Sequence, residues 1–283
     1  MFDSRITLPM LTLALAACDA RTEDPPSYKL QVTESPPALV GERSHLVLDV
    51  LRADGTKATQ FEAHHGQAMH LIATTYDLED FQHVHPRLRS DGSFSVELDF
   101  GRASPYALFA EVTPTASGTG GAGQVLRNTV WPAGAQSGFA QLDASSAFDG
   151  RMAYRATLQD TRVTIAPLEA PLQANCPVEL SIAVDDAQGE PVELEEWMGM
   201  PVHAIAISQD FSQFLHFHGG FASSSPDSHA DHGGHHHQQP ALGGRGLPLA
   251  VHATFPAAGL YKLWVQLRRE DRVITAPLVL EVR

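Results

Sequence analysis

The stretch FQHVHPRL at residues 81–88 and the stretch FLHFHGGF at residues 214–221 decide how this sequence is read. Each places two histidines two positions apart, shortly after a phenylalanine. In a β-strand, residues i and i+2 project from the same face about 6.6 Å apart, so each pair presents two imidazoles to one side of a sheet. The same local pattern written twice predicts a duplicated β domain.

The repeat extends over most of the chain. Three histidines recur at one constant spacing, His70 as His203, His83 as His216 and His85 as His218. Their neighbours recur at the same spacing, Gly66 with Gly199, Asp77 with Asp210 and Phe81 with Phe214. Other similar segments are 28–32 with 154–158, 46–50 with 180–184, and 106–110 with 261–265. The last pair is spaced more widely because the second copy carries an insertion before Leu249.

Short apolar or alternating segments, separated by turn-forming dipeptides such as Asp-Gly and Pro-Pro, make up each copy. In the first copy they cover residues 28–32, 46–51, 69–75, 81–85, 93–100, 106–112 and 125–130, and the second copy repeats them from 154 to 282. The sequence therefore predicts an all-β chain of two tandem immunoglobulin-like antiparallel β-sandwich domains. The expected boundaries are 28–131 and 151–283, with a linker at 132–150.

The first residues predict export. Residues 1–17 contain an apolar run typical of a signal peptide and too short for a membrane-spanning helix. The run ends in Leu15-Ala16-Ala17-Cys18, which resembles the lipobox of bacterial lipoproteins. Cys18 is therefore the expected lipidation site, and residues 18–27 the tether of a lipoprotein that faces the periplasm or cell exterior. The alternative is an ordinary secretory signal with a chance cysteine.

The net charge limits the kinds of partner that the protein can bind, and the cysteine count excludes an internal disulfide. A formal net charge of −14 argues against nucleic acid and anionic lipid surfaces as partners. Contact with a membrane is therefore expected only through the lipid anchor. Apart from Cys18 the chain has only Cys176, which cannot form an internal disulfide and is expected to be a small buried side chain.

A third histidine precedes each His-x-His pair. A turn of polar residues separates it from the pair, so a hairpin brings it opposite, where cross-strand neighbours approach to about 5 Å. Three imidazoles on one face make a metal site with an open coordination position. The expected sites are His70 with His83 and His85, and His203 with His216 and His218. The alternative is that these histidines are structural and hydrogen-bonded to backbone carbonyls.

The second copy adds other metal-capable side chains. Met198 and Met200 lie shortly before His203, and thioether together with imidazole favours copper, although zinc and nickel also suit imidazole. The alternative is that both methionines fill the core. The insertion at 219–246 is rich in histidine and glycine and predicts a collector of metal ions, with a solvated loop as the alternative. Its histidines are His229, His232, His235, His236 and His237.

Signatures of known enzymes are missing from the sequence. His218-Gly219-Gly220 is similar to part of the lipase oxyanion motif, but no Gly-x-Ser-x-Gly elbow accompanies it. Copper–zinc superoxide dismutase is also a β-sandwich with a His-x-His pair, but its disulfide and zinc-bridging residues are not matched here. We therefore expect metal binding without turnover. The alternatives are an adhesion or scaffold module without metal and a dismutase-like enzyme.

The motifs also carry a family resemblance. The run from Gly66-Gln-Ala-Met-His70 through Asp77-Leu-Glu-Asp-Phe81 to His83-Val-His-Pro86 resembles the YtkA-like domains of exported bacterial proteins. The likeness covers most of residues 60–112 and, less closely, 197–218 with 249–283. It implies an immunoglobulin-type fold and a setting around copper and heavy-metal handling. We expect sequestration or delivery of copper, with a metal-transport or efflux protein as partner.

Overall fold

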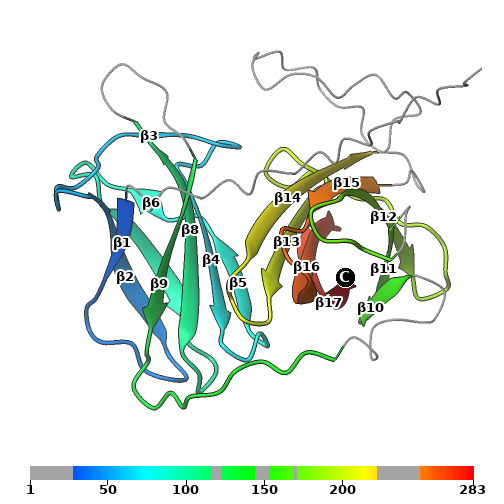
Figure 1. Cartoon of the computed structure of the whole chain (residues 1–283), viewed down its shortest axis with the longest axis horizontal. Helices are drawn as coiled ribbons and strands as arrows, with labels where there is room; N and C mark the ends of the chain where they lie inside the picture. The colour runs from blue at the N-terminus through cyan, green and yellow to red at the C-terminus, as the bar shows by residue number, and fades with distance from the viewer. Residues whose placement is uncertain (1–27, 116–122, 144–152, 168–170, 222–248) are drawn as a thin grey trace, which may run out of the picture.

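The structure is a computed structural model that describes residues 28–115, 123–143, 153–167, 171–221 and 249–283. Regular secondary structure in these ranges consists of β-strands paired in antiparallel sheets, which confirms the predicted fold class (Figure 1). The signal peptide, Cys18 and the tether lie outside the described residues. Within them, no helix has the length and apolar character needed to cross a membrane.

Domain 1 is a sandwich of two sheets. One sheet has the strand order β1-β2-β7-β6 and the other β3-β8-β4-β5, with β9 pairing to β8. Every strand expected for the first copy is present, and two short strands, β3 and β6, were not expected. The strands are β1 (Tyr28–Glu34), β2 (Arg43–Arg52), β3 (Phe61–Glu62), β4 (Met69–Thr75), β5 (Phe81–Val84), β6 (Arg87–Leu88), β7 (Phe94–Asp99), β8 (Tyr106–Pro114) and β9 (Gln124–Val130).

Domain 2 repeats this arrangement in one continuous sheet. Its strand order is β10-β11-β12-β15-β14-β13-β16-β17, and its two edge strands β10 and β17 contact each other around a shared core. The strands are β10 (Tyr154–Leu158), β11 (Thr161–Pro167), β12 (Pro177–Asp186), β13 (Val202–Ser208), β14 (Phe214–Phe221), β15 (Leu249–Thr254), β16 (Gly259–Arg269) and β17 (Arg272–Val282).

The expected match between the opening strands of the two copies is wrong. β1 pairs with β2, and its counterpart beside β12 is β11 rather than β10. Leu30 therefore corresponds to Val163, opposite Val50 and Val184 respectively. Tyr154 had seemed equivalent to Tyr28 because both begin an alternating segment, but β10 is an added strand that pairs with β11.

Cys176 and the insertion also differ from expectation. Cys176 is exposed rather than buried, because it lies in the turn before β12 and not within the strand. The insertion was expected to begin at Gly219, but β14 continues through Phe221 and pairs there with Leu249 of β15. In domain 1 the equivalent continuation is blocked by Pro86, which has no N–H to donate to a ladder. This extension of β14 joins the two halves of domain 2 into one sheet.

The two domains pack against each other through strands that are buried on both faces. Along β4, Leu71 belongs to the core of domain 1, whereas Ile72 belongs to an apolar cluster shared by both domains. Along β13, Ala204 belongs to the core of domain 2 and Ile205 to the shared cluster. The strand period of two therefore gives each of these strands one face for its own core and one for the interface.

Two aromatic stacks hold the interface on either side of a pseudo-twofold axis. Phe81 stacks on Trp264 with ring centroids 4.6 Å apart, and Phe214 stacks on Phe109 at 4.7 Å. Phe81 and Phe214 are equivalent in the repeat, and so are Phe109 and Trp264. Each copy thus contributes the same two positions to the contact, as in the isologous interface of a symmetric dimer.

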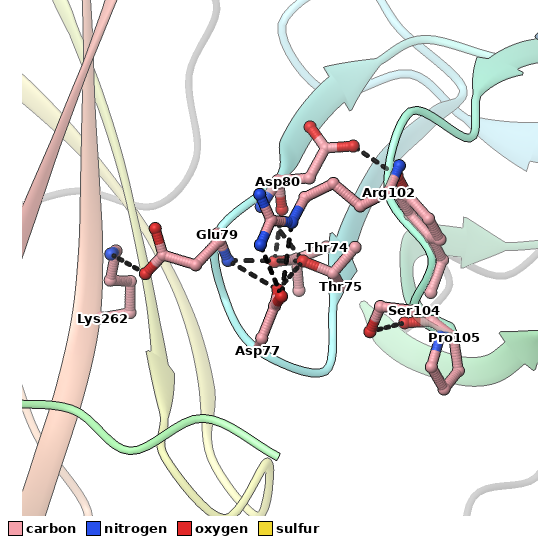
Figure 2. Close-up of polar contacts among 10 residues, drawn as sticks. Thr74, Thr75, Asp77, Glu79, Asp80, Arg102, Ser104, Pro105 and Lys262 are labelled. Atoms are coloured by element: carbon pink, nitrogen blue, oxygen red, sulfur yellow. Dashed lines mark hydrogen bonds and ion pairs between the residues drawn. The ribbon is translucent and has the colours of Figure 1, made fainter. Parts of the chain in front are cut away.

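The turn between β4 and β5 fixes the hairpin that carries the first histidines (Figure 2). Asp77 accepts hydrogen bonds from the Thr75 hydroxyl and the Glu79 backbone N–H and forms an ion pair with Arg102 at 2.9 Å. Glu79 reaches Lys262 of domain 2 at 3.3 Å. In domain 2 the equivalent Asp210 accepts from Ser208 and Ser212 in the same way. Both copies thus fix their hairpins with an aspartate turn.

Gly219 should be required where β14 meets β15. A Cβ on Gly219 would lie 2.7 Å from Val251 Cγ2 and 2.9 Å from the carbonyl oxygen of Ala250, whereas one on Gly220 would meet nothing within 4 Å. We expect Gly219→Ala to lower the free energy of unfolding by about 2 kcal/mol through overpacking. The matched control Gly220→Ala should leave it nearly unchanged. Urea denaturation measures both, and equal effects would contradict the assigned contact.

Candidate metal centre

The two expected histidine triads are both assembled in the structure. One nitrogen from each of His70, His83 and His85 lies within 4.8 Å of the others, and the same holds for His203, His216 and His218. The hairpins act as the sequence predicts. His203 of β13 lies directly opposite His218 of β14. The register of β4 with β5, in which Leu71 faces Val84, places His70 opposite His85 in the same way.

The triads do not form two remote sites but face each other across the domain interface. The His83 ring centroid lies 5.2 Å from that of His216 and 5.9 Å from that of His203. The His70 and His216 centroids are 5.6 Å apart. Ring centroids within one triad are 4.6–5.9 Å apart, so the separations between triads are no larger. The six rings form one group, which we call the histidine cluster.

Backbone carbonyls determine which nitrogen of two rings can bind a metal. His70 Nε2 donates to the carbonyl of His64 at 3.0 Å, and His203 Nε2 donates to that of Trp197 at 2.9 Å. A carbonyl only accepts, so the hydrogen of each neutral ring is on Nε2. In both rings Nδ1 therefore carries the lone pair that remains for a metal.

The central rings are oriented from the opposite domain. His83 Nδ1 donates to Gln266 Oε1 at 2.8 Å, and His216 Nδ1 donates to the carboxylate of Glu111. Gln266 Nε2 is directed to Thr275 Oγ1 at 3.1 Å, which leaves its Oε1 for His83. In both rings Nε2 is thus left with its lone pair. Such a hydrogen bond to the second ring nitrogen is the usual support of a metal-bound histidine.

The spacing of the free nitrogens suits a metal ion. His70 Nδ1 and His83 Nε2 are 3.4 Å apart, and both carry lone pairs. Two lone pairs repel at this distance unless a cation lies between them. A metal–nitrogen bond of about 2.05 Å with tetrahedral angles separates two ligand nitrogens by roughly 3.4 Å. This pair therefore has the separation of two ligands of one ion.

Burial leaves the other inward nitrogens without partners. Among the described residues, the ring nitrogens His85 Nε2, His203 Nδ1, His216 Nε2 and His218 Nε2 are buried and accept no hydrogen bond. An unsatisfied buried polar atom costs about 1–3 kcal/mol. A purely structural role accounts for the bonds to carbonyls but not for these nitrogens. The cluster therefore has the chemistry of a metal site, and its two triads could each hold an ion.

Burial also favours the neutral form of five of the rings. It lowers the pKa of His83 and His218 to about 2 and that of His85 and His203 to about 4, because a charged ring is disfavoured away from water. The pKa of His70 is lowered for the same reason. A ring binds a metal through its neutral form. At neutral pH, therefore, no proton competes strongly for these nitrogens.

The comparisons with known proteins identify a family. The model of a domain of unknown function, DUF8832, matches residues 22–119 and 156–283. The chain belongs to this family. A search of curated proteins finds no match to the sequence. The likeness to YtkA-like domains and the lipoprotein assignment stay predictions.

Several solved structures of β-rich bacterial proteins are distantly similar. They include alpha-2-macroglobulin from Escherichia coli, at 12% identity, 91% coverage of this chain, 17% of that chain and TM-score 0.25. Invasin, a bacterial integrin-binding protein, is 10% identical, with 88% of this chain and 39% of that chain covered and a TM-score of 0.22. Domains 4 and 5 of the S-layer protein SbsC are 9% identical, with 90% of this chain and 97% of that chain covered and a TM-score of 0.21. This chain spans less than a quarter of the macroglobulin structures. Likeness at this level carries no argument about function.

The remaining residues expected at the site are only partly placed. Met198 and Met200 lie half-buried in the turn before β13, and that turn contacts the cluster through Trp197, whose ring centroid is 5.0 Å from that of His203. Their role as sulfur ligands stays a prediction. The loop histidines His229, His232, His235, His236 and His237 lie outside the described residues.

Glu111 and Gln266 were missed by the sequence analysis. They are equivalent in the repeat, each five residues after a tyrosine, Tyr106 in β8 and Tyr261 in β16, and each is a polar side chain between two apolar neighbours. That pattern is a usable signal, because a polar residue within a buried strand needs a partner. The geometry shows the partner to be a histidine of the other domain.

The lowered pKa values of these five rings predict a loss of stability at low pH. The unfolded histidines take up protons below about 6.5, whereas the folded rings, with lower pKa values, do not. The free energy of unfolding of the metal-free protein should therefore be highest above pH 6.5 and fall toward pH 5, by up to about 1.4 kcal/mol per pH unit for each ring. Urea denaturation with EDTA at several pH values measures it.

Variants separate this effect from general acid sensitivity. Replacing both His83 and His218 by glutamine should flatten the pH dependence, whereas replacing the exposed His45 of β2 by glutamine should not. An unfolding midpoint that stays constant between pH 7.5 and pH 5 would contradict neutral burial of the rings.

Proposed function

We propose that this protein binds transition-metal ions, copper above all, in the histidine cluster and holds them for sequestration or delivery. One observation carries the proposal: both triads direct lone-pair nitrogens inward, several of them buried and without partners. Burying these imidazoles without an ion is unfavourable, and an ion in each triad would give their free nitrogens a partner.

The donor set supports copper as the metal. Imidazole binds copper, zinc and nickel, and among divalent first-row ions Cu²⁺ forms the most stable complexes. Met198 and Met200, close to the cluster in the chain, would add softer ligands for Cu⁺. The His-rich segment between β14 and β15 in the sequence would collect further ions. Zinc and nickel are the expected competitors.

The proposed setting is the cell envelope. The apolar run at residues 6–17 and the lipobox-like Cys18 support export and anchoring through lipid. A protein held there would pass its ion to a metal-transport or efflux partner. We propose binding without substrate turnover, since the sequence carries none of the catalytic motifs sought. A metal-free adhesion or scaffold role would instead leave the inward nitrogens unused.

Copper titration of a defined chain tests the proposal. The reference chain is purified without a tag, both cysteines are replaced by serine, and the five loop histidines are replaced by serine, so that neither thiols nor the loop bind copper. We expect it to retain two Cu²⁺ per chain after desalting, as measured by elemental analysis and calorimetry. Replacing all six triad histidines by alanine should abolish this binding.

Matched controls keep the result specific. The exposed histidines His45 and His252 lie outside the cluster, and replacing both by alanine should leave the stoichiometry unchanged. Restoring the loop histidines should add weaker binding without altering the tight sites. Unchanged copper retention after removal of all six triad histidines would overturn the proposal.

A further inference from the structure

The arrangement of the lone pairs defines two ion positions rather than one. The inward nitrogens fall into two groups of three, and within each group all lie within 4.8 Å of one another. Two nitrogens bound to one ion at about 2.05 Å lie at most about 4.1 Å apart, so each group needs only small side-chain shifts to surround one ion with a position left open. Zinc and copper in proteins usually bind about four or five ligands, so six imidazoles in two groups match two ions better than one.

The two positions are close to each other. The rings of His83 and His216, one from each triad, have centroids only 5.2 Å apart, and His70 and His216 are 5.6 Å apart. Ions bound by these rings occupy adjacent coordination spheres. In enzymes, two ions in adjacent spheres act as a pair and share small ligands.

Each triad depends on a positioning residue from the other domain. The ring of His83 is oriented by Gln266 of domain 2, and the ring of His216 by Glu111 of domain 1. The exposed His65 of domain 1 also reaches across, with its ring centroid 4.2 Å from that of His218. The interface is therefore part of each site and not only a contact between two finished sites.

One side of the cluster is open. A pocket of about 250 Å³ is lined by His64, His65, His70, Glu111, His216 and His218, among others. On the pseudo-symmetric side, the positions of His64 and His65 are taken by Trp197 and Met198. The Trp197 ring lies 5.7 Å from His83 and 5.0 Å from His203. A small ligand therefore has an approach to the ions from the domain 1 side.

We propose that the histidine cluster is a single two-metal centre built between the domains, in which a small anion entering from this pocket bridges the two ions. Glu111 and Gln266 are its crossed positioning residues. The inference rests on the proposed function, because it takes each triad as a metal site. It adds that the sites are coupled and that the bridging ligand is of the class of hydroxide or azide.

The two halves of this centre differ in charge. Glu111 gives His216 a carboxylate partner, whereas Gln266 gives His83 a neutral amide. A carboxylate hydrogen bond makes an imidazole a stronger donor to a cation than an amide does. The side chain of His216 is 3% exposed, so solvent screens this effect little. The domain 2 triad therefore loads first and the domain 1 triad second.

Electron paramagnetic resonance during copper titration tests the coupling. The reference chain should give a full Cu²⁺ signal at one equivalent, and the second equivalent should add far less than its share of intensity because neighbouring spins couple. A chain with His203, His216 and His218 replaced by alanine should bind one equivalent with a full, uncoupled signal. Azide should give one charge-transfer band with a single equivalent of Cu²⁺ and a further, different band only when both positions are filled and the anion bridges them.

The outcomes separate this inference from the proposed function. Two equivalents with additive, independent signals would overturn the two-metal centre and leave metal binding by each triad intact. One equivalent shared by all six histidines would also overturn it. Failure to retain copper would overturn both proposals.

The positioning residues have a separate test. Glu111→Gln should weaken the first binding step roughly 10- to 100-fold and make the two steps alike, since both triads then have an amide partner. Gln266→Glu should strengthen the second step. The split between the steps is the readout, because a merely structural defect would weaken both together. An unchanged ratio in both variants would overturn the assigned order of loading.

Discussion

A neutral imidazole has two ring nitrogens that need hydrogen-bond partners or a metal ion. The hairpins β4–β5 and β13–β14 bury more ring nitrogens than the surrounding protein groups can satisfy with hydrogen bonds. β4 and β13 lie between a domain core and the domain interface, so their side chains are shielded from water on both faces. Apolar residues meet this constraint along most of the interface, where Phe81 and Phe214 stack across it. At one end of the interface the buried side chains are the six histidines of the histidine cluster. The stacks hold the domains together closely enough that the histidine rings must share one small volume.

Pseudo-twofold symmetry explains why everything at this interface occurs in pairs. Each copy brings a stack-forming phenylalanine, three histidines and a polar residue that reaches the other copy. A surface that binds its own duplicate is what a symmetric dimer requires. The present chain therefore has the organisation of a dimer whose subunits are joined by a linker, with Ala140 of that linker buried in the shared apolar cluster. Where the copies differ, at His65 with Met198 and Glu111 with Gln266, the symmetry of the cluster is broken around the proposed ion positions.

The sequence was informative where local periodicity decides structure. The strand pattern, the hairpins and the membership of both triads followed from spacing, because strand geometry and a constant repeat determine them. The relation between the domains did not follow, since it depends on which faces of β4 and β13 remain apolar after each core is formed. Glu111 and Gln266 were missed for that reason: each finds its partner in the other copy. The match of Tyr154 with Tyr28 was wrong because β10 has the same alternating pattern as β1. The predicted burial of Cys176 was wrong because this residue lies in the turn before β12 and not in the strand.

Metal affinity and domain packing are thermodynamically linked in this arrangement. An ion that binds only the closed pair of domains stabilises their contact by RT ln(1 + [L]/Kd), about 4 kcal/mol at a thousandfold excess over Kd. The relation is reciprocal, so whatever separates the domains must lower the affinity for the ion by the same free energy. Opening would remove Gln266 from His83 and Glu111 from His216, which weakens both triads at once. If the cluster binds metal as proposed, a site divided between two domains would reconcile tight holding with release, because a partner that competes for the interface need not compete for the metal ligands.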